Sequence, residues 1–511
     1  IGFNNVLYSS ITNYSNKINE IYVIGNVIPY NVFANVNCDK IIVTETVKKV
    51  EANAFTSSTV SEIIFLGDEV ELSDNSFYYT PELKKLTIPN LGNSTLNQIL
   101  GFGVNLDELV LTNITSIPEN SFQDTDIKIT IKGNSLKEIQ SYAFKDYLGE
   151  TITIPSSVTK IYDNAFENTS ANIVWDNPTI EVLTQNTFNG YLGLEVVVPK
   201  SIQKITNSAF EGYRGSIDFS QVEELVIGDE AFYRYYGENI TIPSIVKEIG
   251  YGAFSDYKGS ITWDNPTIEV IKTGTFTGYL GNELVIPDSV KTIEEHAISN
   301  NSNLLKLTIP FVGTSLDAES NYRFDYIYDN EYVVLDELNI TQGTILRKGA
   351  LENVDALAIN LPNSLNTIKE GAFKYSTVQK IIVPNSVTTL EANAFSGCRN
   401  LFELGLPFLG TSEEGSLFID LFGADYSEVV YQYKDGKYVY GMQPQYLEIL
   451  HINGTKINDY ALFGITTIKE INIASTVDYI GLGAFLYCDN LTCVNYHGTI
   501  YEWANIEMVS S

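Results

Sequence analysis

The chain has 511 residues, of which 63 are acidic and 31 basic, so its formal net charge is −32. This charge repels the phosphates of nucleic acids and anionic lipids, which argues against both as partners, while a basic protein surface or a divalent cation stays open. No apolar run reaches the ~18 residues of a transmembrane helix, so we expect no membrane insertion.

The first segment, residues 1–20, fits no repeating pattern. Its apolar residues include Phe3 and Leu7. A stack of coils exposes its core at each end unless an atypical segment covers it, so we expect this segment to be an N-terminal cap. Regular coils begin at Ile21, and we expect one solenoid domain over residues 21–493.

A phenylalanine returns every 22 residues through the middle of the chain, and the series continues toward both ends. A fixed period of this length is typical of stacked-coil proteins and replaces the usual domain count by one solenoid of roughly 20 coils. We call these positions the ladder residues. They are Phe33, Phe55, Phe77, Phe122, Phe144, Phe166, Phe188, Phe210, Phe232, Phe254, Phe276, Ile298, Leu351, Phe373, Phe395, Leu462 and Phe485.

Each coil repeats one pattern around its ladder residue, as residues 151–166 illustrate. Apolar residues alternate up to Pro155, which predicts a short strand that ends there because proline has no N–H for a ladder. Val158 and Ile161 form a second apolar edge, and Phe166 forms a third. One coil cannot bury three edges, so its neighbours must cover them. We therefore expect a β-rich repeat solenoid with a parallel sheet.

Two segments carry a family resemblance. They read Ile286-Pro-Asp-Ser-Val-Lys-Thr-Ile293 and Val383-Pro-Asn-Ser-Val-Thr-Thr-Leu390 followed by Glu-Ala-Asn-Ala-Phe395. This pattern resembles the BspA-like leucine-rich repeats, and it recurs over almost the whole chain. The resemblance implies a right-handed, leucine-rich-repeat-like coil. It also implies a secreted or cell-surface protein that serves adhesion or host interaction.

A second period of 44 residues lies on top of the first between Phe144 and Phe276. Residues 173–182 return almost unchanged at 261–270, which a duplication explains. The strand ending at Trp175 is shifted by one residue against that ending at Ile154, and a shift of one residue turns every side chain of a strand to the other face. We expect the preceding turn to absorb the shift, so that Trp175 points into the core and Val174 outward.

Three coils are longer than the rest, near residues 89–121, 310–350 and 407–461. Their openings carry helix-start signals, including a capping box at Thr411 and Glu414. We expect a short helix and a loop in each, all projecting from one side of the coil. Because tyrosine can sit half exposed and contact a partner, the tyrosines of the last two coils are the candidate ligand contacts. Helix packing against the solenoid explains them at least as well. They are Tyr322, Tyr326, Tyr328, Tyr431, Tyr433, Tyr438 and Tyr440.

The last segment, residues 494–511, predicts a C-terminal cap, with Trp503 closing the final coil. The four cysteines are Cys38, Cys398, Cys488 and Cys493. Cys398 and Cys488 occupy the same phase of distant coils and cannot meet, which favours buried free thiols. A bridge between Cys488 and Cys493 is the only disulfide that the spacing allows.

No pattern in the sequence indicates catalysis, a cofactor or a metal. The three histidines belong to no metal-ligand or nucleophile motif. Asp176-Asn177 could offer calcium ligands, but Asp-Asn-Pro is first of all a turn. We therefore expect a non-enzymatic, monomeric, extracellular or cell-surface protein that binds an extracellular protein or glycan. The alternative is a passive stalk that presents another module.

Overall fold

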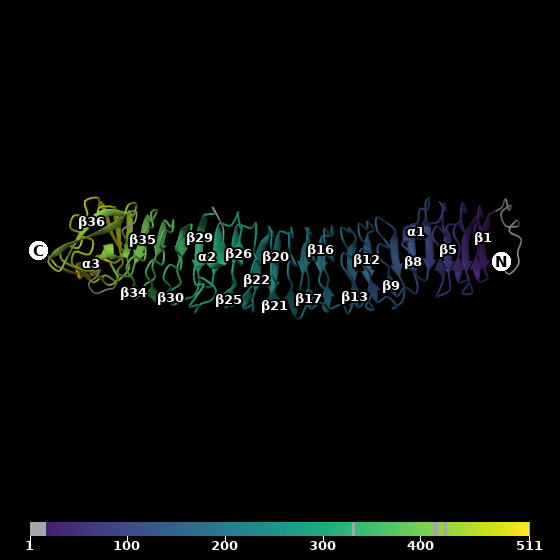
Figure 1. Cartoon of the computed structure of the whole chain (residues 1–511), viewed down its shortest axis with the longest axis horizontal. Helices are drawn as coiled ribbons and strands as arrows, with labels where there is room; N and C mark the ends of the chain where they lie inside the picture. The colour runs from purple at the N-terminus through teal and green to yellow at the C-terminus, as the bar shows by residue number, and fades with distance from the viewer. Residues whose placement is uncertain (1–16, 330–332, 412–416, 424–426, 510–511) are drawn as a thin grey trace. The chain divides into compact units, whose positions relative to one another are not determined.

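The computed structural model describes residues 17–329, 333–411, 417–423 and 427–509. Contacts divide the chain into two compact units, Ile1–Phe254 (unit 1) and Ser255–Ser511 (unit 2). Both are parallel β-coils, with about 21 turns of about 22 residues in all. Figure 1 shows the strands of successive turns lying side by side within each unit. The repeat solenoid predicted from the sequence is confirmed. Most of the predicted N-terminal cap lies outside the described residues, and β1 begins at Ile18.

The first part of unit 1 has an unbroken six-stranded parallel sheet made of the strands that precede each second edge. It contains β1 (Ile18–Val23), β3 (Cys38–Val43), β5 (Glu62–Phe65), β7 (Lys85–Ile88), β8 (Glu108–Leu111) and β10 (Lys128–Ile131). It is followed by β12 (Thr151–Ile154), β14 (Asn172–Trp175), β16 (Glu195–Val197), β18 (Ser216–Asp218) and β20 (Asn239–Pro243). Helix α1 (Leu96–Leu100) lies in the first long coil, where a short helix was predicted.

The second apolar edge of unit 1 forms short parallel sheets of its own. The first sheet contains β2 (Val27–Ile28), β4 (Lys49–Val50) and β6 (Glu71–Leu72). The second contains β9 (Ser116–Ile117), β11 (Glu138–Ile139) and β13 (Lys160–Ile161). The third is β15 (Val182–Leu183), β17 (Lys204–Ile205), β19 (Leu225–Ile227) and β21 (Val246–Ile249). Each turn therefore contributes one strand to each of two edges.

Buried tyrosines interrupt the long parallel sheet of unit 1. Among the described strands of unit 1, β12 pairs with β14 and β16 with β18, but no ladder joins β10 to β12, β14 to β16, or β18 to β20. At each gap a tyrosine hydroxyl donates to a carbonyl of the preceding coil. These bonds join Tyr147 to Ile127 at 2.7 Å, Tyr191 to Ala171 at 2.8 Å, and Tyr235 to Gly215 at 2.6 Å.

The two paired positions in the same region have no tyrosine ring that reaches back. Tyr213 precedes β18 but donates to Ser216 of its own coil at 2.9 Å. Thr169 stands at the corresponding place before β14, and its small side chain donates to the carbonyl of Tyr147 at 2.7 Å. A ring that reaches back occupies the space between two strands, whereas a small side chain or a ring turned forward leaves the strands free to pair. The gaps after β10, β14 and β18 therefore recur every second coil, which gives the 44-residue period a structural basis.

The third edge has no such gaps in the regular coils of either unit, because of an unusual backbone conformation. In every described turn the residues two before and two after the ladder residue have positive φ, for example 60° at Asn164 and 54° at Asn168 around Phe166. This alternation points three N–H groups at the next coil: those of Asn164, Phe166 and Asn168 donate to carbonyls there at 3.0, 3.1 and 2.8 Å. Glycine, asparagine and aspartate are common at these positions because they adopt left-handed φ most readily.

The ladder residues stack inside each unit. Phe210 is fully buried, and its ring centroid lies 5.3 Å from that of Phe188 and 5.5 Å from that of Phe232, with nearly parallel ring planes. This spacing is within the range that aromatic pairs prefer. The predicted phenylalanine stack is confirmed.

Unit 2 opens with β22 (Ser260–Asp264) and then builds a nine-stranded parallel sheet. That sheet contains β24 (Glu283–Val285), β27 (Lys306–Ile309), β29 (Leu335–Ile340), β31 (Ala356–Asn360), β33 (Lys380–Ile382), β35 (Glu403–Leu406), β38 (Ile449–Ile452), β40 (Glu470–Ile473) and β42 (Cys493–Tyr496). Among the described strands no ladder joins β22 to β24, and here Tyr279 donates to the carbonyl of Gly259 at 2.9 Å. As in unit 1, a tyrosine that bonds to the preceding coil accompanies the gap in the sheet.

The other edges of unit 2 form short parallel sheets, as in unit 1. Their strands are β23 (Val270–Ile271), β25 (Thr292–Ile293), β26 (Ile298–Ser299), β28 (Tyr328–Asp329), β30 (Ile345–Leu346), β32 (Thr367–Ile368), β34 (Thr389–Leu390), β39 (Lys456–Ile457), β41 (Tyr479–Ile480) and β43 (Glu507–Met508). The long coils add α2 (Phe324–Ile327), the 3-10 helix η1 (Phe418–Leu421) and the antiparallel pair β36 (Ser427–Lys434) and β37 (Lys437–Pro444). The predicted capping box at Thr411 and Glu414 falls partly outside the described residues.

The predicted register shift is absorbed as expected. Strand β14 pairs with β12 so that Trp175 lies beside Ile154, and the ring of Trp175 meets Phe166 and Phe188 edge-on at 6.5 and 6.4 Å. Val174 is exposed. The inward direction of Trp175 is confirmed, although its ring is only half-buried.

The last helix, α3 (Ile500–Ala504), does not place Trp503 in the core. Its ring is 37% exposed and lies against Tyr496, with 5.2 Å between ring centroids. The buried residue of this segment is Ile506. The expectation that Trp503 closes the final coil is therefore wrong, because α3 follows a strand at the open end of the sheet and presents no buried face.

Candidate functional site

The long coil around α2 places three of the candidate tyrosines, and it buries one of them. The N–H of Phe324 donates to the carbonyl of Ala350 at 2.8 Å, as a ladder residue does, so α2 takes the place of a ladder turn. Tyr328 is buried against Phe324, with 4.7 Å between ring centroids. Tyr322 and Tyr326 are half-buried. Only these two offer a ring surface to a partner.

The third long coil brings the other four candidates together on a hairpin. We had expected a loop after the helix, but β36 and β37 pair in antiparallel register. Asp435 and Gly436 at its tip have φ of 50° and 79°, which is the pattern of a type I′ turn. Directly opposite pairs on one face are Tyr431 with Tyr440 and Tyr433 with Tyr438.

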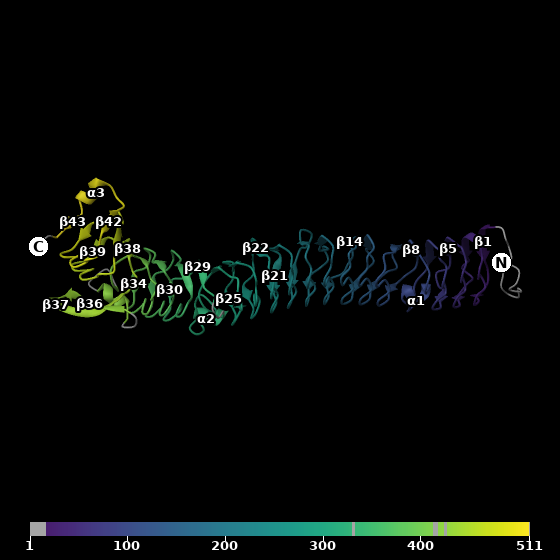
Figure 2. The ribbon, with the colours of Figure 1, turned by 90° about the horizontal axis from the view of Figure 1, so that it is seen from above.

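Exposure separates these four tyrosines. Tyr431 is 58%, Tyr438 67% and Tyr440 74% exposed, whereas Tyr433 is half-buried. Figure 2 shows the hairpin and α2 on the same side of unit 2, away from β29, β38 and β42. We call this side the insertion face, and define it by the hairpin, the α2 coil and the ladder turns between them.

Two buried glutamines fix the hairpin to the coil beneath it. Gln432 is fully buried; its amide nitrogen donates to the carbonyl of Ala461 at 2.9 Å, and its amide oxygen accepts from the N–H of Ile419 at 3.2 Å. On the other strand, Gln443 bonds the backbone N–H of Thr466 at 3.0 Å and the hydroxyl of Thr466 at 2.8 Å. The hairpin is therefore a docked part of the unit, and its tyrosines have a defined position.

An aromatic cluster continues from the hairpin onto the next ladder turns. The ring of Tyr433 lies 5.2 Å from Tyr438 and 4.9 Å from Tyr460, and Phe463 lies 5.1 Å from Tyr487. Tyr460 and Tyr487 have φ of 54° and 62°, a conformation that is strained for a bulky residue. Sequence reasoning missed both. The signal was tyrosine two residues from a ladder position, where glycine and asparagine fit better.

A groove of about 470 Å³ lies between the two insertions, over the ladder turns at 349–352, 371–374 and 393–396. Two ion pairs lie in it, Arg323 with Glu352 at 2.8 Å and Lys348 with Glu370 at 2.7 Å, and Lys374 also lines it. Tyr322, Asn393 and Ser396 also line it. The groove thus offers hydrogen-bonding groups and a ring beside two ion pairs and one further ammonium, a combination suited to a polar ligand.

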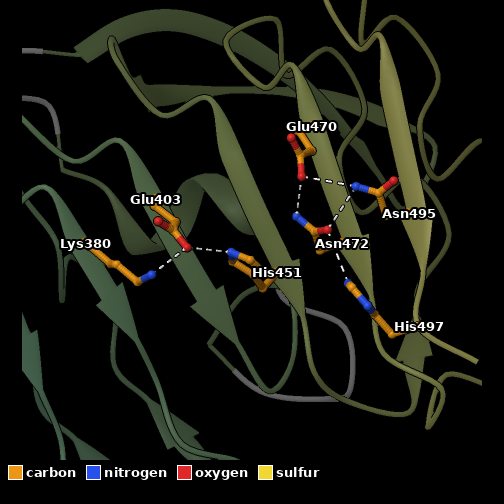
Figure 3. A network of polar contacts seen from close by, with 7 residues as sticks. All are labelled: Lys380, Glu403, His451, Glu470, Asn472, Asn495 and His497. Atoms are coloured by element: carbon orange, nitrogen blue, oxygen red, sulfur yellow. Dashed lines mark hydrogen bonds and ion pairs between the residues drawn. The ribbon is translucent and has the colours of Figure 1, made fainter.

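The sheet face of unit 2 carries a separate polar network, which Figure 3 shows. Glu403 accepts from Lys380 at 3.0 Å and contacts Nε2 of His451 at 2.8 Å. Burial opposes ionisation of Glu403, but these two bonds outweigh it and keep the pKa of its carboxyl below the usual range.

Further along the same sheet, Asn495 donates to Asn472 at 3.1 Å, and His497 lies 3.2 Å from Asn472. Asn472 in turn donates to Glu470 at 2.9 Å. The hydrogen-bonding groups of these side chains are paired with one another across neighbouring strands. We therefore assign the network a role in stabilising the sheet. Within the described ranges, no helix is long and apolar enough to cross a membrane, and no group of three metal-ligating side chains gathers.

Comparison with known proteins supports the repeat assignment. A family model described as the BspA type leucine rich repeat region matches residues 26–148, 115–225, 225–327, 320–419 and 439–506. No curated protein sequence matches the chain.

Several solved structures are similar to this chain at low identity. A leucine rich cell surface protein from Faecalibacterium prausnitzii is 16% identical, with a TM-score of 0.22, over 98% of this chain and 93% of that one. The pneumococcal vaccine antigen PcpA is 16% identical, with a TM-score of 0.29, over 74% of this chain and 85% of that one. The family match spans most of the sequence, and the chain belongs to the BspA-type leucine-rich repeat family.

Proposed function

We propose that the protein is a non-enzymatic, extracellular or cell-surface binding protein whose insertion face recognises an extracellular protein or glycan. The observation that carries this proposal is the hairpin, which holds three exposed tyrosines in fixed positions through two buried glutamines. Tyrosine is enriched at binding hot spots because a rigid ring supplies a large contact area together with a hydroxyl.

The neighbouring groove supports a polar partner. Its ion pairs are internal, and Tyr322 stands at its wall, so a sugar or a polar peptide could stack and form hydrogen bonds there. The net charge of −32 argues against nucleic acid and anionic membrane. The protein acts as a monomer in this proposal, and it uses no cofactor.

The experiment is a screen of the full chain against a glycan array and a panel of extracellular proteins. The double variant Tyr431→Ser/Tyr440→Ser removes two exposed rings from the hairpin without touching Gln432 or Gln443. We expect it to weaken binding of any hit at least about tenfold, as loss of hot-spot residues does. The matched control is Tyr251→Ser, which removes one exposed ring from unit 1.

The competing function is a passive stalk, which the many regular coils would also suit. A stalk predicts no saturable binding by either screen, or binding that the hairpin variant and the control weaken equally. Unchanged thermal unfolding of the double variant is required before a loss of binding is assigned to the insertion face.

A further inference from the structure

At each gap in the long sheet, the strand before the gap carries an inward-facing residue at its end. This residue comes nine positions after a ladder residue. These residues are Ile131, Trp175, Phe219 and Trp263. In unit 2 the indole nitrogen of Trp263 donates to the carbonyl of Val285 at 2.8 Å, so the ring spans the gap between β22 and β24. In unit 1 Phe219 is buried, and Trp175 packs against two ladder rings. Three gaps are thus filled by an aromatic side chain.

The first gap has isoleucine at this position, and the part of the gap beyond the ring of Tyr147 is open. A cavity of about 700 Å³ lies between β10 and β12, lined by Ile129, Ile131 and Ile152 among others. Ile129 and Ile131 are only half-buried, although the corresponding residues of β8, Leu109 and Leu111, are fully buried. The missing ring leaves both apolar surface and space.

The backbone beside this cavity is only partly paired. Within residues 17–329 no ladder joins β10 to β12. Lys128 bonds toward β8, and Asn172 of β14 bonds to Glu150. Because residues of a parallel strand alternate in the side to which they bond, Ile131 turns its backbone groups toward those of Thr151 and Thr153, while the N–H of Ile129 bonds to the hydroxyl of Tyr147. β10 and β12 lie too close together for another strand to insert between them, so only the backbone atoms that face the cavity are open to a ligand.

The rim of the cavity is acidic. It carries the carboxylates of Asp107, Asp126, Glu150 and Asp176 against one ammonium, that of Lys128. Asp107 has a cationic partner in Lys84 at 3.6 Å, and Lys128 lies 3.6 Å from Glu108. The excess of negative charge selects a cationic occupant.

We propose that this cavity, the β10–β12 groove, binds an extended segment of a partner protein in which an aromatic residue is flanked by lysine or arginine. The aromatic ring occupies the space that Trp175 and Trp263 fill in the other gaps. The cationic side chains reach Asp126 and Glu150, and the peptide backbone lies along the mouth of the cavity. This site is on the sheet face of unit 1, and it is independent of the insertion face.

The probe is the synthetic peptide acetyl-Lys-Thr-Trp-Thr-Lys-amide, titrated into full-length protein labelled at isoleucine methyl groups for NMR. We expect saturable shifts of the Ile129, Ile131 and Ile152 methyl signals. A peptide with alanine in place of tryptophan, and one with glutamate in place of both lysines, should each bind at least about tenfold more weakly.

The decisive variant is Ile131→Trp, which fills the groove with the residue that the chain itself uses at this position in two other coils. It should fold, because the space already exists, and it should lose peptide binding. Phe219→Trp makes the corresponding change at a gap that is already filled and should leave binding unchanged. The proposal is overturned if the peptide shifts none of the three methyl signals at saturating concentration, or if folded Ile131→Trp binds as well as the original chain.

Discussion

The side-chain amide of Gln432 donates to the main-chain carbonyl of Ala461 at 2.9 Å, where regular coils use a ladder residue's N–H. In a regular coil the corresponding bond runs from the N–H of Phe373 to the carbonyl of Ala394, also at 2.9 Å. The hairpin interrupts the stack of ladder turns, and a glutamine replaces the backbone donor. The third edge of the coil is thereby kept paired across an insertion.

Gln432→Leu should loosen the hairpin. It would leave the carbonyl of Ala461 and the N–H of Ile419 buried without partners, and each such group costs about 1–3 kcal/mol. We expect amide exchange in β36 and β37 to quicken by a factor of about ten or more, with little change in β40. Val439→Ala is the control, because Val439 lies opposite Gln432 on the hairpin and makes no such bond. Equal protection of the hairpin in Gln432→Leu would contradict this account.

Phe210→Ala should destabilise unit 1 by about 3–5 kcal/mol, because it opens a cavity in the ring stack. Phe210 is fully buried between Phe188 and Phe232. Urea unfolding followed by circular dichroism would measure the loss. Leu194→Ala, at a highly exposed position of the same unit, should change stability by less than about 0.5 kcal/mol. A cost below about 1 kcal/mol for Phe210→Ala would show that the stack is not core.

The tyrosines at the sheet gaps should make the fold sensitive to alkali. Burial raises the pKa of Tyr147 to about 12, whereas an unfolded tyrosine ionises near pH ~10. Stability from this group is therefore complete below pH ~10 and falls by about 1.4 kcal/mol per pH unit between ~10 and ~12. Unfolding free energies measured across this range should fall less steeply in Tyr147→Phe, which cannot ionise. The same slope in both proteins would refute the assignment.

The cysteines should differ sharply in reactivity. Cys398 is buried, its thiol donates to the carbonyl of Phe373 at 3.1 Å, and burial raises its pKa to about 12. Cys493 is an exposed free thiol. A disulfide reagent at pH 8 should label Cys493 in the folded protein and Cys398 only after denaturation, since the thiolate is the reacting form. Cys493→Ser should abolish the rapid labelling; rapid labelling that persists would contradict this placement.

The repeat could be predicted from the sequence because it follows from burial alone. Phe166 and its equivalents mark one apolar edge, and the alternation before Pro155 marks another, so the period specifies the stack. The shift at Trp175 was predictable for the same reason, since a buried face leaves a strand only one register. The hairpin also had a sequence signal, which is Asp435-Gly436 between alternating tyrosines. The helix-start signals before it led us to predict a short helix followed by a loop.

The sheet gaps and the docking of the hairpin could not be predicted in this way. Tyr191 and Tyr213 occupy the same phase of their coils, yet one ring bonds backward and the other forward. That choice depends on the space between two particular strands, which a one-dimensional pattern does not describe. Gln432 is likewise one polar residue in a tyrosine-rich segment, and its role depends on the distance between η1 and Ala461.

The strained tyrosines supply the last prediction. Tyr487 has a φ of 62°, lies in the aromatic cluster next to Phe463, and is 59% exposed. A left-handed φ is unfavourable for a bulky residue, and residues strained in this way cluster at functional sites. Tyr487→Asn should therefore keep the stability of the chain within about 1 kcal/mol, because relief of strain offsets the lost ring contact.

Its effect on binding should be larger than its effect on folding. For any ligand found by the glycan and protein screens, Tyr487→Asn should weaken binding about tenfold, because an exposed ring beside the hairpin is lost. Tyr79→Asn is the matched control: Tyr79 has a φ of 53° at the same phase of a coil, is 48% exposed, and lies in unit 1. If both variants weaken binding equally, or if neither does, the aromatic cluster is not the contact surface and the strained tyrosines need another explanation.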